Sequence, residues 1–87
     1  MWNYRLCKQT YRSESFEEVA YEIREAYYNK DGGIWAVTEN AARPFGESPG
    51  ELTTVLDRMK TALDKEIIDL DTFVFARQDI EKDDIVR

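Results

Sequence analysis

The sequence has no histidine, and its 87 residues include only one cysteine, two prolines and four glycines. Without histidine the chain lacks the commonest general base and metal ligand, which excludes Ser-His-Asp and Cys-His catalysis and histidine-containing zinc sites. The single cysteine, Cys7, excludes an internal disulfide and fits a reducing cytosol. Cys7 would be a nucleophile only beside an activating group, so we interpret it as a small apolar residue on a strand.

Long hydrophobic runs are also missing. No stretch is long and apolar enough for a membrane span, and the first residues lack the basic and apolar regions of a signal peptide, so we expect a cytoplasmic protein. A chain of this length makes one domain and buries only about 60–65% of its unfolded surface. We predict a single domain over residues 1–76, followed by a charged and mobile tail over residues 77–87.

Positive charge is in deficit, since the net charge is −6 and residues 44–87 carry six basic against eleven acidic groups. A chain of this sign is a poor electrostatic partner for a phosphate backbone, so we expect no direct nucleic-acid binding. The acidic residues after the helix lack the spacing and the glycine of an EF-hand loop, and we interpret them as solvated charge: Asp64, Glu66, Asp69 and Asp71. No metal or cofactor is expected.

Residues 46–64 form the clearest predicted element, an amphipathic helix. Ser48 begins a capping box in which its hydroxyl accepts from the Glu51 N–H and the Glu51 carboxylate reaches back to the Ser48 N–H. Pro49 suits the first helical position. The apolar residues that follow recur at helical spacing and form one stripe: Leu52, Val55, Leu56, Met59, Ala62 and Leu63. Such a helix needs an apolar surface to cover.

Residues 19–28 fit two patterns. Their apolar residues match helical spacing, but they also alternate as in a strand. The segment NKDGG at residues 29–33 is a strong hairpin signal, and a hairpin turn needs a strand on its near side. We therefore predict a strand, with a helix as the open alternative.

The strand pairing expected from a three-residue turn with a glycine bulge places Tyr27 opposite Trp35 and Glu25 opposite Val37. One sheet face then receives the helix stripe, and its members are Tyr21, Ile23, Tyr27, Trp35 and Val37. Residues 2–10 form the first strand, and residues 72–76 are a candidate for a fourth. The predicted fold is α+β, with a three- or four-stranded antiparallel sheet covered on one face by a single helix, in the order β-β-β-α-β.

Several short motifs together resemble a family of short uncharacterised bacterial proteins: WNYR at residues 2–5, EAYY at 25–28, TEN at 38–40, GES at 46–48, EL at 51–52 and MKTAL at 59–63. More remotely, the helix entry through GES with Glu51 is similar to that of the HicB-type antitoxin domain. This resemblance implies three strands, a helix and a further strand in a partial ribonuclease-H-like fold. HicB antitoxins usually carry a separate DNA-binding segment, which the short acidic tail does not resemble.

The sheet face opposite the helix is mixed in character and apolar near the hairpin, which is typical of an interface. We therefore predict a small acidic protein-binding module, antitoxin-like in type, that acts by contact and forms a homodimer. A competing expectation is that residues 71–87 fold back and shield the same surface, with Phe73 and Phe75 as the cover. The candidate interface residues are Trp2, Tyr4, Arg24, Tyr28 and Ile34. An acidic inhibitor that mimics nucleic acid is the alternative. An enzyme is the least favoured class, because no nucleophile with its base, phosphate loop or metal site is present in the sequence.

Overall fold

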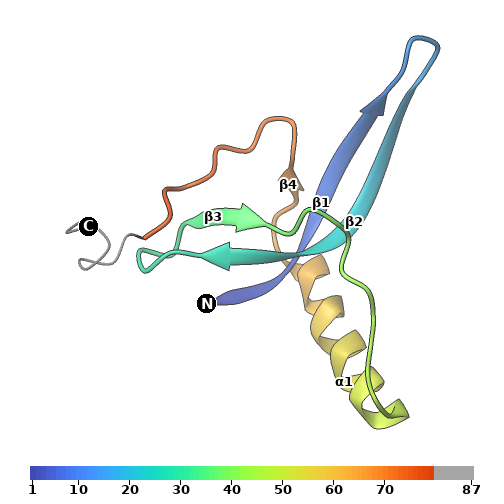
Figure 1. Ribbon diagram of the computed structural model, residues 1–87, viewed down its shortest axis with the longest axis vertical. Coiled ribbons are helices and arrows are strands. Elements are labelled where there is room, and N and C mark those ends of the chain that lie inside the picture. Colours follow the sequence, from blue (N-terminus) through green and yellow to red (C-terminus); the bar gives the residue numbers. More distant parts are fainter. Residues whose placement is uncertain (80–87) are drawn as a thin grey trace, which may run out of the picture.

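A computed structural model describes residues 1–79 of the chain (Figure 1). The elements in chain order are β1 (Trp2–Arg12), β2 (Glu17–Tyr28), β3 (Ile34–Val37), α1 (Pro49–Lys60), the 3₁₀ helix η1 (Thr61–Asp64) and β4 (Ile68–Asp69). The predicted α+β class and the order β-β-β-α-β are confirmed. The four strands form one sheet, which is curled as a half-barrel.

The sheet is mixed, which corrects the expectation of a purely antiparallel one. The strand order is β3-β2-β1-β4, with β1–β2 and β2–β3 antiparallel and β4 parallel to β1. The fourth strand is Ile68–Asp69 and not residues 72–76. Because η1 packs against β1, the chain leaves the helix beside that strand and re-enters the sheet along it, with Cys7 opposite Ile68.

The strand predicted at residues 19–28 is confirmed, since β2 spans Glu17–Tyr28. The turn that follows is held by Asn29, whose Oδ1 accepts from the N–H groups of Asp31 at 3.0 Å and Gly33 at 2.9 Å. Gly32 has φ +87°, a conformation that glycine adopts without strain. The hairpin chemistry at residues 29–33 therefore decides the structure of the ambiguous stretch before it.

The register between β2 and β3 differs by one residue from the predicted one. Tyr28 pairs with Ile34 and Tyr27 with Ala36, so a bulge at Trp35 shifts the pairs that follow. Val37 then lies opposite Ala26 instead of Glu25 and packs against the buried core. A single bulged residue moves the later side chains of a strand to the other face, which is why turn length alone gave the wrong face for Val37.

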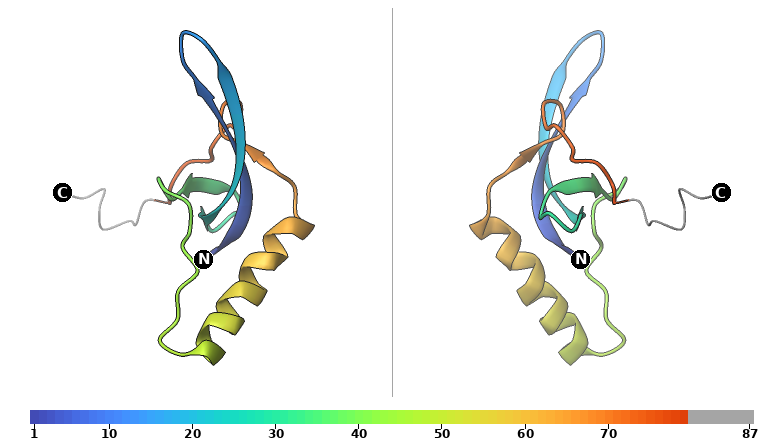
Figure 2. Two further views of the ribbon diagram at one scale, coloured as in Figure 1. Left: turned by 90° about the vertical axis from the view of Figure 1, so that its right-hand side faces the viewer. Right: turned by 90° about the vertical axis from the view of Figure 1, so that its left-hand side faces the viewer.

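The buried core lies on the sheet face that the sequence predicts to be open. Its buried members are Cys7, Ala26, Ile34 and Ile68. Residues 70–76, which we call the strap, cross this face, and Leu70 and Phe73 pack against the core (Figure 2). The strap is fixed at both ends, because the Leu70 N–H donates to the Lys8 carbonyl at 3.0 Å and the Ala76 N–H to the Ile34 carbonyl at 2.7 Å.

The helix lies against β1 and extends away from the sheet (Figures 1 and 2). Its contacts with the sheet are mainly those of α1 and η1 with β1, and its buried residues are Met59 and Ala62. The predicted covering of the Tyr21 face is not observed, since Tyr21 is 58% exposed. The strap already closes the other face, so the helix stripe stays partly open at Leu56 and Leu63.

The helix begins at the predicted cap. Ser48 Oγ accepts from the Glu51 N–H at 3.1 Å, whereas the Glu51 carboxylate accepts from the Glu47 N–H at 2.8 Å and not from Ser48. Gly46 lies so close to the first turn that an added Cβ would come within 2.5 Å of the Leu52 nitrogen. Glycine at this position allows the chain to fold back under the helix entry.

The first residues of the predicted tail are bonded to the hairpin turn. Asn29 Nδ2 donates to the Arg77 carbonyl at 2.9 Å, and the Lys30 N–H donates to Asp79 Oδ2 at 2.6 Å. Residues 77–79 therefore continue the strap onto the turn. The predicted mobile tail also includes residues 80–87, which lie outside the described residues.

Replacing Ser48 with alanine removes the side-chain acceptor for the Glu51 N–H. We expect the free energy of unfolding to fall by about 1 kcal/mol, which for a domain of this size lowers the melting temperature by roughly 4–8 °C. Ser48→Asp, which keeps an acceptor at the cap, is the matched control and should melt close to the wild type. An unchanged melting curve for Ser48→Ala would contradict a role for this cap in stability.

Replacing Phe73 with alanine weakens the strap over the core. We expect a loss of about 2 kcal/mol in the free energy of unfolding, less than for a fully buried phenylalanine, together with faster reaction of Cys7 with a thiol reagent. The control is Val74→Ala, since Val74 is 88% exposed and should leave both measurements unchanged. Equal behaviour of the two variants would show that the strap does not protect the core.

Candidate functional site

The five predicted interface residues do not form one surface. Trp2 and Tyr4 lie on the sheet face away from the strap, because they pair with Tyr27 and Glu25 of β2. Arg24 and Ile34 lie on the core face and are each only 8% exposed. Tyr28, also on the core face, is half-buried and packs against the core. The residues of the core face are therefore structural, which corrects their assignment to an interface.

Two arginines on the core face are held by hydrogen bonds within the protein. Arg24 donates to the Thr38 carbonyl at 2.8 Å and to Gln9 Oε1 at 3.3 Å, and it forms an ion pair with Glu22 at 3.3 Å. Arg5 donates to the Tyr28 hydroxyl at 2.9 Å and to the Glu66 carbonyl at 2.7 Å. The buried charge of Arg24 is tolerated because it is paired with Glu22, whereas the partly buried Arg5 is held by neutral acceptors. These contacts join β1, β2 and the loop before β4.

Cys7 lies in this core and is fully buried. Burial raises the pKa of the thiol above its ordinary value of 9.0, and the neighbouring Glu22 raises it further, while Arg24 and Arg5 oppose the rise. A thiol with a raised pKa stays protonated at neutral pH and is a poor nucleophile. The structure thus places Cys7 where the sequence predicts it, as a small apolar residue on a strand.

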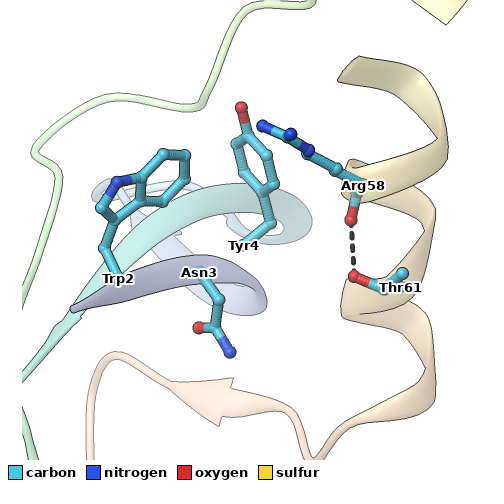
Figure 3. Close-up of a pocket in the computed structure, with 5 residues that line it drawn as sticks. All are labelled: Trp2, Asn3, Tyr4, Arg58 and Thr61. Atoms are coloured by element: carbon cyan, nitrogen blue, oxygen red, sulfur yellow. Dashed lines mark hydrogen bonds between the residues drawn. The ribbon is translucent and has the colours of Figure 1, made fainter. Parts of the chain in front are cut away.

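A hollow of about 360 Å³ lies between the start of β1 and the end of the helix (Figure 3). Its lining residues are Trp2, Asn3, Tyr4, Arg58 and Thr61. The rings of Trp2 and Tyr4 meet edge to face with centroids 5.1 Å apart, and the Arg58 side chain extends towards Tyr4 in Figure 3. An aromatic pair beside a guanidinium is a frequent composition of protein contact sites.

Arg58 is one of the three members of this hollow that the sequence does not indicate, together with Asn3 and Thr61. It falls on the polar side of the helical pattern, and only the packing of η1 against β1 brings it opposite Trp2 and Tyr4. No periodicity rule could have found it, because the contact depends on how the helix is placed against the sheet.

Large apolar side chains are exposed over two further parts of the molecule. One patch follows the helix and contains Leu56 at 47%, Leu63 at 60% and Ile67 at 52% exposure. The other lies on the half of the β1–β2 hairpin that includes its turn, and it contains Phe16 at 59%, Val19 at 46% and Tyr21 at 58% exposure. Scattered exposed apolar residues are ordinary, whereas exposed apolar side chains that lie together are typical of contact surfaces, so these two groups are candidates.

Among residues 1–79 no group of three or more histidine, cysteine or acidic residues is placed to hold a metal ion. The acidic residues near β4 have other partners, since Asp69 pairs with Lys8 at 3.8 Å and Asp71 with Arg12 at 3.3 Å. Within the same residues, no helix has the length and apolarity needed to cross a membrane.

Comparisons with known proteins give no relative. No protein-family model matches the chain, and neither a curated protein nor a solved structure matches it significantly. The surface described above therefore has to be interpreted from its own chemistry.

The raised pKa of Cys7 predicts a loss of stability at alkaline pH. The thiol of the unfolded chain loses its proton near pH 9.0, before that of the folded chain, so the free energy of unfolding falls as the pH rises from 9 through the folded pKa. Denaturant unfolding at pH 8 and pH 10 measures the loss, and Cys7→Ala, in which this contribution is absent, corrects for the other groups that titrate there. A wild type and a Cys7→Ala variant that lose the same stability would contradict the assignment.

Proposed function

We propose that this chain is a small protein-binding module that acts by contact, with the helix patch and the Trp2–Tyr4–Arg58 hollow as its binding surface. The observation that carries the proposal is the exposure of Leu56 and Leu63 on a helix whose stripe would otherwise be expected to cover the sheet. Their exposure leaves apolar area for another protein to bury. The antitoxin-like role implied by the HicB resemblance is one form of this activity.

The chemistry of the surface supports a protein as the bound molecule. Arg58 and Lys60 are the basic residues of the last helical turn; Arg58 lies beside the aromatic pair, and Lys60 lines a neighbouring hollow with Leu63. Tryptophan, tyrosine and arginine are enriched where proteins bind one another, and leucines on one helix face are typical anchors. The net charge of −6 disfavours a nucleic acid as the direct partner.

The proposal includes no catalytic step. The buried Cys7 has a raised pKa, and the hydroxyl of Thr61 donates to the Arg58 carbonyl at 2.6 Å. Neither group is therefore presented to a substrate as an activated nucleophile.

The test compares two variants of α1 in affinity capture from cells of the source organism. Leu56→Asp introduces one negative charge in the exposed apolar patch, and Thr53→Asp introduces the same charge at an exposed position of the same helix. We expect the wild type and Thr53→Asp to retain the same protein in stoichiometric amounts and Leu56→Asp to retain at least about tenfold less, as for loss of an interface anchor.

Two outcomes would contradict the proposal. Equal recovery of every protein by all three chains would show that the helix patch is not a binding surface. Recovery of a nucleic-acid-binding protein that excess nucleic acid displaces, with no effect of Leu56→Asp, would favour the acidic mimic instead. Far-UV circular dichroism of each variant verifies that the fold is retained.

A further inference from the structure

Residues 9–22, the hairpin arm, extend beyond the body of the sheet as a ribbon of two strands (Figure 1). On one side, β4 pairs with β1 only at Cys7 and Lys8. On the other side, the chain that follows β3 bonds to β2 as far as Ile23, whose carbonyl accepts from the Ala42 N–H at 2.7 Å. A two-stranded hairpin with no third layer is marginally stable in water, yet this arm carries the exposed patch of Phe16, Val19 and Tyr21.

The arm is acidic, and the helix end has exposed lysines within a segment, residues 57–66, that holds three basic and three acidic groups. Glu14 and Glu18 are exposed on the arm, and Lys60 and Lys65 are exposed at the helix end. In residues 1–79 none of these four groups lies within ion-pair distance of an opposite charge. Figure 1 shows the reason, since the arm and the helix extend to opposite ends of the molecule.

We infer that a second copy of this chain is the partner, and that each copy lays its hairpin arm along the helix of the other. In a pair with two-fold symmetry, the arm of the first copy lies beside the helix of the second. The same symmetry then places the arm of the second copy beside the helix of the first, so both contacts form at once. The acidic groups of the arm then face the basic groups of the helix end, and the two apolar patches meet. This inference rests on the proposed function, because it names one partner of the same helix patch.

The two apolar patches supply about half of the area that a stable pair buries. The arm patch and the helix patch together contain six side chains that are each about half exposed. Only Phe16 and Tyr21 are aromatic, and aromatic side chains bury about 150–250 Å² each, so with four smaller aliphatic groups the half-exposed side chains offer on the order of 400 Å² before their polar neighbours are counted. A standard interface buries about 800 Å² per partner.

Charge favours the arm–helix contact over other contacts between copies. Two chains of net charge −6 repel each other, so a stable pair must oppose groups of unlike sign. At the arm–helix contact Glu14 and Glu18 of one copy face Lys60 and Lys65 of the other, on a helix end whose charges sum to zero. Contact between two arms would instead bring acidic groups together.

The test is charge exchange, followed by sedimentation equilibrium of the full chain at micromolar concentration. The arm variant is Glu14→Lys with Glu18→Lys, and the helix variant is Lys60→Glu with Lys65→Glu. Each variant alone opposes like charges at both contacts, and we expect its dimer to dissociate at least about tenfold more readily than that of the wild type. An equimolar mixture of the two variants restores unlike charges at both contacts, and we expect a heterodimer within about threefold of the wild-type affinity.

The arm variant separates this inference from general repulsion. It makes the chain less negative, so repulsion between whole chains would strengthen its dimer, whereas the arm–helix contact predicts weakening. All four positions are exposed, so the variants should retain the fold, which circular dichroism verifies.

Three results would overturn the inference: a monomeric wild type, a dimer that the helix variant leaves unchanged, or a mixture that does not recover. The second result would indicate that the arms pair edge to edge. A monomeric wild type whose captured partner is still lost on Leu56→Asp would leave the proposed function standing with a different protein as partner. Loss of both effects would remove the proposed function as well.

Discussion

The contact of residues 70–76 with the sheet is the interaction on which the arrangement of this protein depends. The strap begins at a hydrogen bond to Lys8 on β1 and ends at a hydrogen bond to Ile34 on β3, so it crosses the two strand pairings from β1 to β3. Between these points Leu70 and Phe73 close the core. An added Cβ at Gly33 would come within 2.7 Å of the Ala76 side chain, which shows how closely the end of the strap fits the hairpin turn.

Because an irregular segment closes the core, the helix does not have to do so. In a small α+β domain a single amphipathic helix normally covers the sheet, since each apolar face needs another layer. Here α1 is attached mainly through Met59 and the adjoining η1, which pack against β1. The remainder of its stripe is available to solvent or to a partner. The same arrangement brings Arg58 opposite the Trp2–Tyr4 pair.

The sequence predicts those features that depend on neighbouring residues. The hairpin turn at residues 29–33 correctly selects a strand for β2, and the Ser48 cap lies where the motif places it. The register of β3 is not predictable in this way, because the bulge at Trp35 is not specified by the turn length.

The strap is expected from the sequence only as the competing alternative, a tail folded back with Phe73 and Phe75 as its cover, because periodicity does not favour it. Its apolar residues Leu70, Phe73 and Phe75 follow neither the helical nor the strand period, so a periodicity search finds at best a short strand. Their role is set by the sheet they cross, through contacts that are distant in sequence. The candidate surface has the same origin: once the strap occupies one face, the helix and the arm retain the apolar residues that no described segment covers.

The small core and the exposed apolar residues also link the proposed assembly to stability. The fully buried core is small, and its largest members are Ile68 and Cys7. A chain of 87 residues with such a core has little free energy of folding in reserve. A partner that binds the folded helix patch and not the unfolded chain adds stability in proportion to the logarithm of its concentration over the dissociation constant. The arm gains most, since it has no third layer of its own. The proposed function therefore implies that folding and binding are coupled, because the same exposed apolar surface limits the stability of the chain when it is alone.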